Sequence, residues 1–116
     1  MKIIIQPYSQ MRYRTCGDYI QQNGEWYIYV AQLYKRRYEW LVALHEIIEC
    51  YLCYWLGIKE QDIYLFDLTY RGDGEPGNEK DAPYHIQHRI ATFFEWIFSK
   101  ILFVNWTRYG QNIDEL

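Results

Sequence analysis

A change of hydrophobic period near residue 36 is the feature that most limits what this chain can fold into. Before it, β-prone runs at 19–22 and 25–30 flank Asn23-Gly24, and further candidate strands lie at 3–6 and 11–16. An Asn-Gly pair between such runs predicts a hairpin, because both central residues of a type I′ turn need positive φ. From Arg36 to Gly57, apolar side chains recur at three- and four-residue steps, which predicts one long helix.

The rest of the chain predicts two more helices separated by a loop. Residues 58–70 favour a shorter helix, with a strand as the alternative. Residues 71–83 hold three glycines and two prolines and predict a loop, residues 84 to about 104 predict a second long helix, and residues 105–116 are interpreted as a tail. Because 116 residues suffice for one domain only, we expect a single α+β domain over 1–116. A small N-terminal antiparallel sheet should pack on two long helices and one shorter helix.

Charge and composition limit the classes of partner. Twelve basic and fifteen acidic residues give a net charge of −3, which provides no basic surface for nucleic acid. The most apolar stretch, residues 90–106, is interrupted by Glu95 and Lys100 and is shorter than the ~20 residues that a membrane span needs. We therefore expect a cytoplasmic protein that binds neither nucleic acid nor membranes.

The cysteines favour the same compartment. Their number is odd, and Cys50 and Cys53 fall within the predicted long helix rather than in a small disulfide-rich scaffold. A redox C-x-x-C motif needs a helix N-terminus to lower the pKa of a thiol, so a position in mid-helix favours buried thiols. The N-terminal apolar run is too short for the core of a signal peptide. We expect reduced thiols in the cytoplasm.

The long helix contains the string His45-Glu46-Ile47-Ile48-Glu49, an H-E-x-x-E arrangement. Side chains four residues apart lie on one helix face, so His45 and Glu49 can bind one cation while Glu46 is turned by about 100°. The same spacing underlies H-E-x-x-H zinc sites, in which the Glu polarises the attacking water. A carboxylate is an acceptable zinc ligand, although it shifts preference towards harder metals. The pattern also predicts that Trp40, Leu44, Ile48, Tyr51 and Trp55 face the core, with His45 and Glu49 at its border.

The last predicted helix offers a third ligand. His85 and His88 are one turn apart, and His88 shares a helix face with Glu95. If the two long helices pack side by side, His45, Glu49 and one of these histidines leave a fourth position for water, as in an open catalytic zinc site. We favour His88, because Glu95 can orient it or join as a ligand. His85 and Glu95 are therefore alternates for the metal site.

Two resemblances accompany these motifs. The string L-V-A-L-H-E-I-I-E, preceded by a small sheet, resembles the active-site helix of zincin metallopeptidases. That resemblance implies that His45 and Glu49 are metal ligands and that Glu46 is the general base. A larger share of the chain, including H-E-I-I-E, the E-P-G loop and A-P-Y-H-I-Q-H, resembles small uncharacterised proteins encoded by phages and prophages. This second resemblance implies a bacterial host and one feature that spans the loop and both helices.

Three hypotheses follow for function. The first is a zinc-dependent hydrolase, peptidase-like, in which Glu46 activates metal-bound water; another divalent metal could replace zinc. The second is a non-enzymatic phage or bacterial accessory protein with a structural or vestigial metal site, whose tyrosine- and tryptophan-rich surface binds a protein or peptide. The third is a two-metal carboxylate site built from Glu46, Glu49, His85, His88 and Glu95. Substrate and oligomeric state are open.

Overall fold

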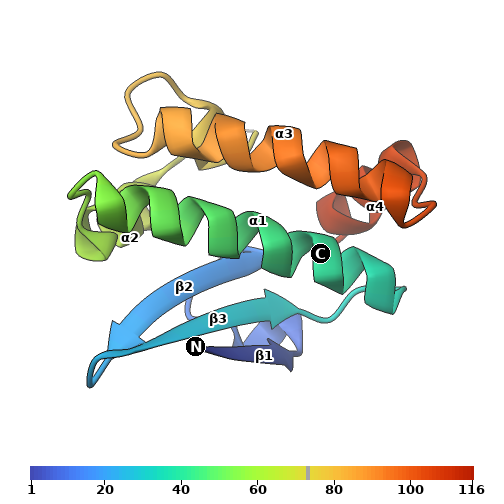
Figure 1. Cartoon of the computed structure of the whole chain (residues 1–116), viewed down its shortest axis with the longest axis horizontal. Helices are drawn as coiled ribbons and strands as arrows, with labels where there is room; N and C mark the ends of the chain where they lie inside the picture. The colour runs from blue at the N-terminus through green and yellow to red at the C-terminus, as the bar shows by residue number, and fades with distance from the viewer. Residues whose placement is uncertain (73) are drawn as a thin grey trace.

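A small sheet and two long helices form the body of the molecule (Figure 1). The computed structural model describes residues 1–72 and 74–116, and this part of the chain holds three strands and four helices. The α+β class expected from the sequence is confirmed. The elements are β1 (Lys2–Gln6), β2 (Gly17–Gln22), β3 (Glu25–Ala31), α1 (Arg36–Trp55), α2 (Glu60–Thr69), α3 (His85–Ile101) and α4 (Trp106–Asp114), with 3₁₀ turns at Tyr8–Gln10 and Pro76–Asn78.

The sheet has the order β1-β3-β2 and is mixed. The predicted hairpin is confirmed: β2 and β3 are antiparallel, and Asn23 and Gly24 have φ values of 53° and 77°. The prediction of an antiparallel sheet throughout is wrong at β1, which pairs in parallel with β3. The described residues 11–16 form no strand either. They belong to the connection from β1 to β2, which carries the chain to the far edge of the sheet. There β2 runs back, so that β3 returns between the two strands in the direction of β1.

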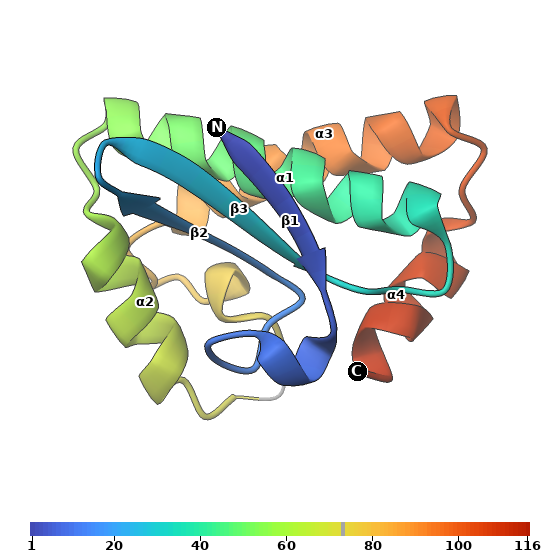
Figure 2. The same ribbon diagram turned by 90° about the horizontal axis from the view of Figure 1, so that it is seen from below.

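Helices α1 and α3 lie side by side and run in opposite directions (Figures 1 and 2). The predicted end of α1 is confirmed, because Gly57 has a φ of 74° and the N–H groups of Gly57 and Ile58 bond to the carbonyls of Tyr54 and Cys53. The sheet packs against one side of α1, and α3 against the neighbouring side. The inner sides of α1 and α3 therefore meet above the sheet.

The prediction of which side of α1 is buried is wrong. Trp40, Tyr51 and Trp55 are 51%, 47% and 78% exposed, whereas His45 and Glu49 are buried. The sheet and α3 cover the arc that carries the H-E-x-x-E string, and no other described segment covers the opposite arc (Figure 2). The core beside α1 contains Ile28, Leu41 and other buried side chains of β2, β3 and α1.

The C-terminal residues form a helix, so the prediction of a tail is wrong. Helix α4 begins after Asn105, whose side-chain oxygen accepts a hydrogen bond from the backbone N–H of Arg108. Tyr109 is 2% exposed and anchors α4 against Tyr38 of α1. The shorter helix predicted for residues 58–70 is confirmed by α2, and the strand alternative is wrong.

Two further expectations concern the loop and the cysteines. The loop at 71–83 contains one 3₁₀ turn, and its Asp73 lies outside the described residues. The three cysteines are free thiols, and Cys50 and Cys53 are buried as predicted. None of the described helices has the length and apolar composition that crossing a membrane requires.

Candidate metal centre

Three side chains from α1 and α3 converge between the two helices. His45 Nε2 lies 3.0 Å from Glu49 Oε2 and 3.1 Å from His88 Nδ1, and His88 Nδ1 lies 3.0 Å from Glu49 Oε2. Tetrahedral zinc with bonds of about 2.0–2.1 Å separates its ligand atoms by about 3.3–3.4 Å, so a small outward shift would admit the ion. Within residues 1–72 and 74–116, this is the one group of His, Cys, Asp or Glu side chains with such an arrangement. The cluster could hold a metal ion.

The helices explain why these three residues meet. His45 and Glu49 are four residues apart on α1 and therefore point to the same side. His88 lies near the start of α3, which runs antiparallel to α1 and brings this residue next to the C-terminal half of α1 (Figure 1). All three side chains are buried. The expectation that the long helices pack side by side and bring His88 to the H-E-x-x-E string is confirmed.

Two further carboxylates set the protonation of the histidine rings. Glu95 Oε1 lies 2.7 Å from His45 Nδ1, and Glu75 Oε2 lies 3.0 Å from His88 Nε2, the latter at ion-pair distance without the alignment of a hydrogen bond. An ionised carboxylate only accepts hydrogen bonds, so it favours the tautomer whose facing nitrogen carries the proton. The lone pairs of His45 Nε2 and His88 Nδ1 are then directed at the Glu49 oxygen. Three acceptor atoms at mutual distances near 3 Å need a cation between them, either a metal ion or protons.

In the metal-free chain, protons take this role. Burial opposes a charge on His45, but hydrogen bonds to Glu49 and Glu95 outweigh burial and hold the pKa of His45 well above its ordinary value. Burial likewise opposes charge on His88, yet Glu49 and Glu75 raise its pKa to about 9. Burial alone would raise the pKa of Glu49, and hydrogen bonds from the two histidines lower it instead. Metal and protons therefore compete for the same atoms.

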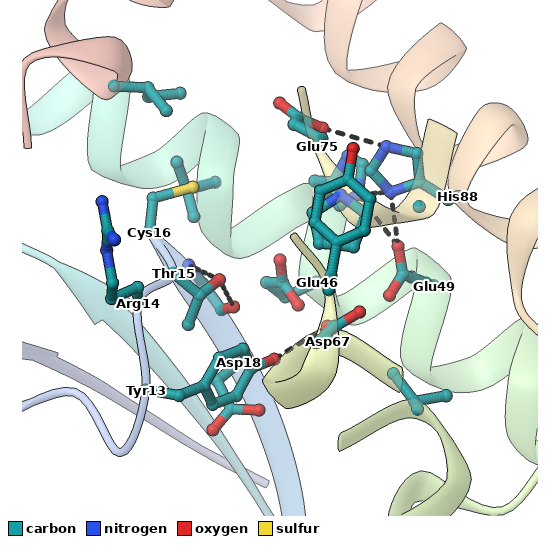
Figure 3. A pocket seen from close by; sticks show the side chains of 18 of the residues that line it. Tyr13, Arg14, Thr15, Cys16, Asp18, Glu46, Glu49, Asp67, Glu75 and His88 are labelled. Atoms are coloured by element: carbon teal, nitrogen blue, oxygen red, sulfur yellow. Dashed lines mark hydrogen bonds and ion pairs between the residues drawn. The ribbon is translucent and has the colours of Figure 1, made fainter. Parts of the chain in front are cut away.

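Glu46 projects into a cavity beside this cluster (Figure 3). The cavity has a volume of about 740 Å³, and Figure 3 shows Glu46 between Thr15 and Glu49. Burial, followed by the charge of Glu49, raises the pKa of Glu46 well above its ordinary value. No hydrogen bond to its carboxylate is found within the described residues. The strand β2 approaches closely, since a Cβ atom at Gly17 would lie 2.5 Å from Glu46 Oε1.

The two alternates for the metal site have different places. His85 Nδ1 donates to the Gly77 carbonyl at 3.0 Å, so this ring holds the loop and lies outside the cluster. Glu95 contacts His45 rather than His88, and its second oxygen accepts a hydrogen bond from the Tyr109 hydroxyl. The carboxylate therefore orients the histidine of the other helix. The two-metal hypothesis requires His85 at the cluster, and the structure does not place it there.

The sequence reasoning missed several residues that support the cluster. Glu75 comes from the loop at 71–83. Tyr19 of β2 donates a hydrogen bond of 3.1 Å from its hydroxyl to Glu49 Oε1. Gly77 lies against the His88 ring so closely that a Cβ atom would overlap with Cγ and Nδ1 of that ring. The signal in the sequence that points to Glu75 and Gly77 is the E-P-G string within the loop at 71–83.

A second polar group lines the same cavity. Asp67 of α2 accepts hydrogen bonds from the hydroxyls of Tyr13, at 2.9 Å, and Tyr84. Burial raises the pKa of Asp67 to about 6, although both hydroxyls oppose the rise. Asp18 lies nearby and is paired with Arg12 at 2.5 Å. This wall of the cavity therefore carries one titratable carboxyl group and two hydroxyls.

The site thus combines two imidazole nitrogens and one carboxylate oxygen with a further buried carboxyl group in an adjoining cavity. Such a donor set suits a divalent transition metal, and a neighbouring carboxylate suits proton transfer. The cluster is therefore a candidate metal centre with a candidate proton acceptor beside it. Comparison of the chain with protein-family models, curated proteins and solved structures finds no match in any of the three.

Proposed function

We propose that this protein is a zinc-dependent hydrolase in which His45, Glu49 and His88 hold one ion and Glu46 is the general base. The observation that carries the proposal is the convergence of three donor atoms beside a buried carboxyl group in one cavity. Two histidines and one glutamate with an open fourth position form a known set of catalytic zinc ligands. The same donor set also suits non-haem Fe(II). We favour zinc because a carboxyl group beside the ion, such as Glu46, can accept the proton of a water in hydrolysis, the reaction for which zinc activates water.

The chemistry divides between the ion and the chain. Zinc, when bound, lowers the pKa of a coordinated water to about 7 and polarises a carbonyl group. Glu46 accepts the proton from the water, and the burial that raises its pKa brings this carboxyl group closer to the working pH of a general base. Glu95 orients the His45 ring through a hydrogen bond, and the charge of Glu75 beside His88 Nε2 favours a proton on that nitrogen, so that the unprotonated nitrogens of both rings face the ion. A cavity of about 740 Å³ has the size of a small-molecule site.

Elemental analysis of protein purified without a His tag or chelator tests the metal site. We expect about one zinc per chain in the wild-type protein and almost none in His45→Ala. His85→Ala is the matched control, because it removes the same kind of side chain one turn outside the cluster. It should keep the ion. A wild-type chain that stays metal-free after incubation with zinc contradicts the proposal, and iron in place of zinc contradicts the assignment of hydrolysis.

Glu46→Gln separates the role of Glu46 from metal binding. We expect this variant to retain zinc and to lose hydrolysis of the peptides or esters that the wild-type protein cleaves, by a factor of about 10²–10⁴. Glu115→Gln makes the same change at an exposed position near the C-terminus and should leave activity unchanged. Full activity in Glu46→Gln would exclude this residue as the base. Zinc-loaded wild-type protein that cleaves no substrate would assign the ion a structural role.

A further inference from the structure

The outer sides of α1 and α3 form an uncovered apolar surface, which we term the α1/α3 face. Figures 1 and 2 show the two helices along one side of the molecule, where no other described segment lies over them. At 100° per residue, all members of the face except one lie about 120° or more around the helix from the buried His45 or His88, and Trp55, at the C-terminal end of α1, lies about 80° from His45. The face consists of Trp40, Tyr51, Tyr54, Trp55, Ile86, Ile90, Phe93, Phe94 and Ile101, which are 39% to 78% exposed.

The face lacks charge as well as cover. Between Trp40 and Leu56, the only charged or titratable side chains on α1 besides tyrosines and cysteines are His45, Glu46 and Glu49, and all three point inwards. On α3, Arg89 and Lys100 fall together at the margin of the face, away from the side that meets α1. A charged partner would therefore add no favourable electrostatic energy at this surface. Contact with another apolar surface lowers the free energy, because it removes apolar side chains from water.

The area of the face exceeds what a monomer commonly exposes. The exposed fractions of its nine residues correspond to roughly 1,000 Å² on one chain, whereas the largest apolar patch of a typical monomer is about 300–600 Å². One partner of a standard-size interface contributes about 800 Å². The face is therefore large enough for a stable dimer without help from other surfaces.

We propose that the α1/α3 face is the interface between two copies of this chain. Two antiparallel helices form a broad surface that a two-fold axis can pair with itself, and closed two-fold dimers are the commonest oligomers. Interfaces of obligate homodimers resemble a domain core cut in half, which fits a face without charged members. Pairing places Trp55 and Phe93 in a shared core of four helices.

The dimer leaves the metal centre accessible. None of the nine residues of the α1/α3 face lines the cavity that contains Glu46. The inner sides of α1 and α3 carry the cluster, and the outer sides carry the interface. This inference therefore does not depend on the proposed hydrolase function, and each can fail alone.

Sedimentation equilibrium of the full wild-type chain, from low to high micromolar concentration, tests the dimer. We expect a mass of twice the 14.3 kDa of one chain. Tyr51→Glu and Phe93→Glu each place a charge within the face and should raise the dissociation constant at least about tenfold. Leu65→Glu is the matched control, because Leu65 is 50% exposed on α2, outside the face, and this variant should stay dimeric.

Several outcomes would overturn the proposal. Wild-type protein that sediments at 14.3 kDa at every concentration would exclude the dimer, and this result requires no variant to fold. A dimer that persists in both charged variants, with native far-ultraviolet circular dichroism, would place the interface elsewhere. A monomer that cosediments with vesicles of phosphatidylcholine and phosphatidylglycerol would assign the face to lipid instead.

Discussion

The inner and outer sides of α1 and α3 reverse the usual distribution of side chains. The inner sides bury His45, Glu49, His88 and Glu95, whereas the outer sides expose aromatic and aliphatic residues such as Trp55. An amphipathic surface helix normally buries its apolar stripe and exposes its polar one. A buried polar cluster and an exposed apolar face each carry a cost in free energy when the chain is alone and metal-free. The ion proposed for the inner side and the second copy proposed for the outer side would each offset one of these costs.

The inner sides of α1 and α3 restrict the geometry of a bound partner more strictly than their outer sides do. On the inner side, three atoms meet at distances of 3.0 to 3.1 Å, Glu95 forms a hydrogen bond with the His45 ring, and Glu75 lies at ion-pair distance from the His88 ring. On the outer side, contacts of apolar side chains depend on area rather than on direction. Changes to the inner side should therefore have large and residue-specific effects, and changes to the outer side should have small effects within one chain.

Metal removal should give the largest effect and affects only the inner side. At free zinc of about 1,000 times the dissociation constant, binding to the folded chain adds about 4 kcal/mol to its stability. For a chain of this size, we expect a chelator to lower Tm by about 10–20 °C. Differential scanning calorimetry with zinc and with EDTA measures the shift, and His45→Ala should show none. An equal shift in that variant would place the stabilising ion elsewhere.

The pH dependence of the metal-free protein should give the next largest effect. The pKa of His88 is about 9 in the folded chain, above the value of about 6.5 for an unfolded one. Folding therefore favours the protonated ring, and this stabilisation is fully present below pH 6.5 and lost as the pH rises through 9. It amounts to about 3 kcal/mol at most.

Urea denaturation in EDTA across this pH range measures the effect. The free energy of unfolding should depend less on pH in His88→Gln, because glutamine is polar but does not titrate. Zinc affinity should change in the opposite direction and increase over the same range, because the ligand nitrogens must lose their protons. A zinc affinity that does not depend on pH would argue against the histidine ligands.

Gly77 and Gly74 lie in the same loop, and replacing each by Ala distinguishes a steric clash with His88 from a general loss of backbone flexibility. A Cβ atom at Gly77 would overlap with the His88 ring, whereas nothing lies within 4 Å of a Cβ atom at Gly74. We expect Gly77→Ala to cost about 1–3 kcal/mol and to weaken zinc binding about 10–100-fold, because the ring or the loop must move. Gly74→Ala should change neither quantity. Competition with a chromophoric chelator measures the affinity, and equal losses in both variants would contradict the close contact.

Trp55 should give the smallest effect within a single chain. Its side chain is 78% exposed, so Trp55→Ser in a monomeric Phe93→Glu background should change the free energy of unfolding by less than about 0.5 kcal/mol. Urea denaturation of the two proteins gives the difference. A loss of 2 kcal/mol or more would mean that Trp55 packs on its own chain and that the two sides of α1 are less different than the structure indicates.

Local signals explain what could be predicted about the fold. The Asn23-Gly24 turn and the end of α1 at Gly57 follow from backbone preferences that act over a few residues. The parallel pairing of β1 and the helix α4 could not be predicted, because pairing between distant strands and the docking of Tyr109 depend on contacts far apart in the sequence. A nine-residue helix also has little stability of its own in water.

For the candidate metal centre, too, some features follow from local sequence and others only from contacts between distant segments. The amino-acid sequence by itself determined that His45 and Glu49 share one helix face and that His88 is available on another helix, because 3.6 residues per turn fixes these relations. Which side of α1 is buried was decided only by the tertiary structure. Apolar residues occupy most of one arc of α1, so periodicity alone selected Trp55 as a core residue. The sheet and α3 instead cover the arc with His45 and Glu49, since burial depends on which surfaces the rest of the chain reaches.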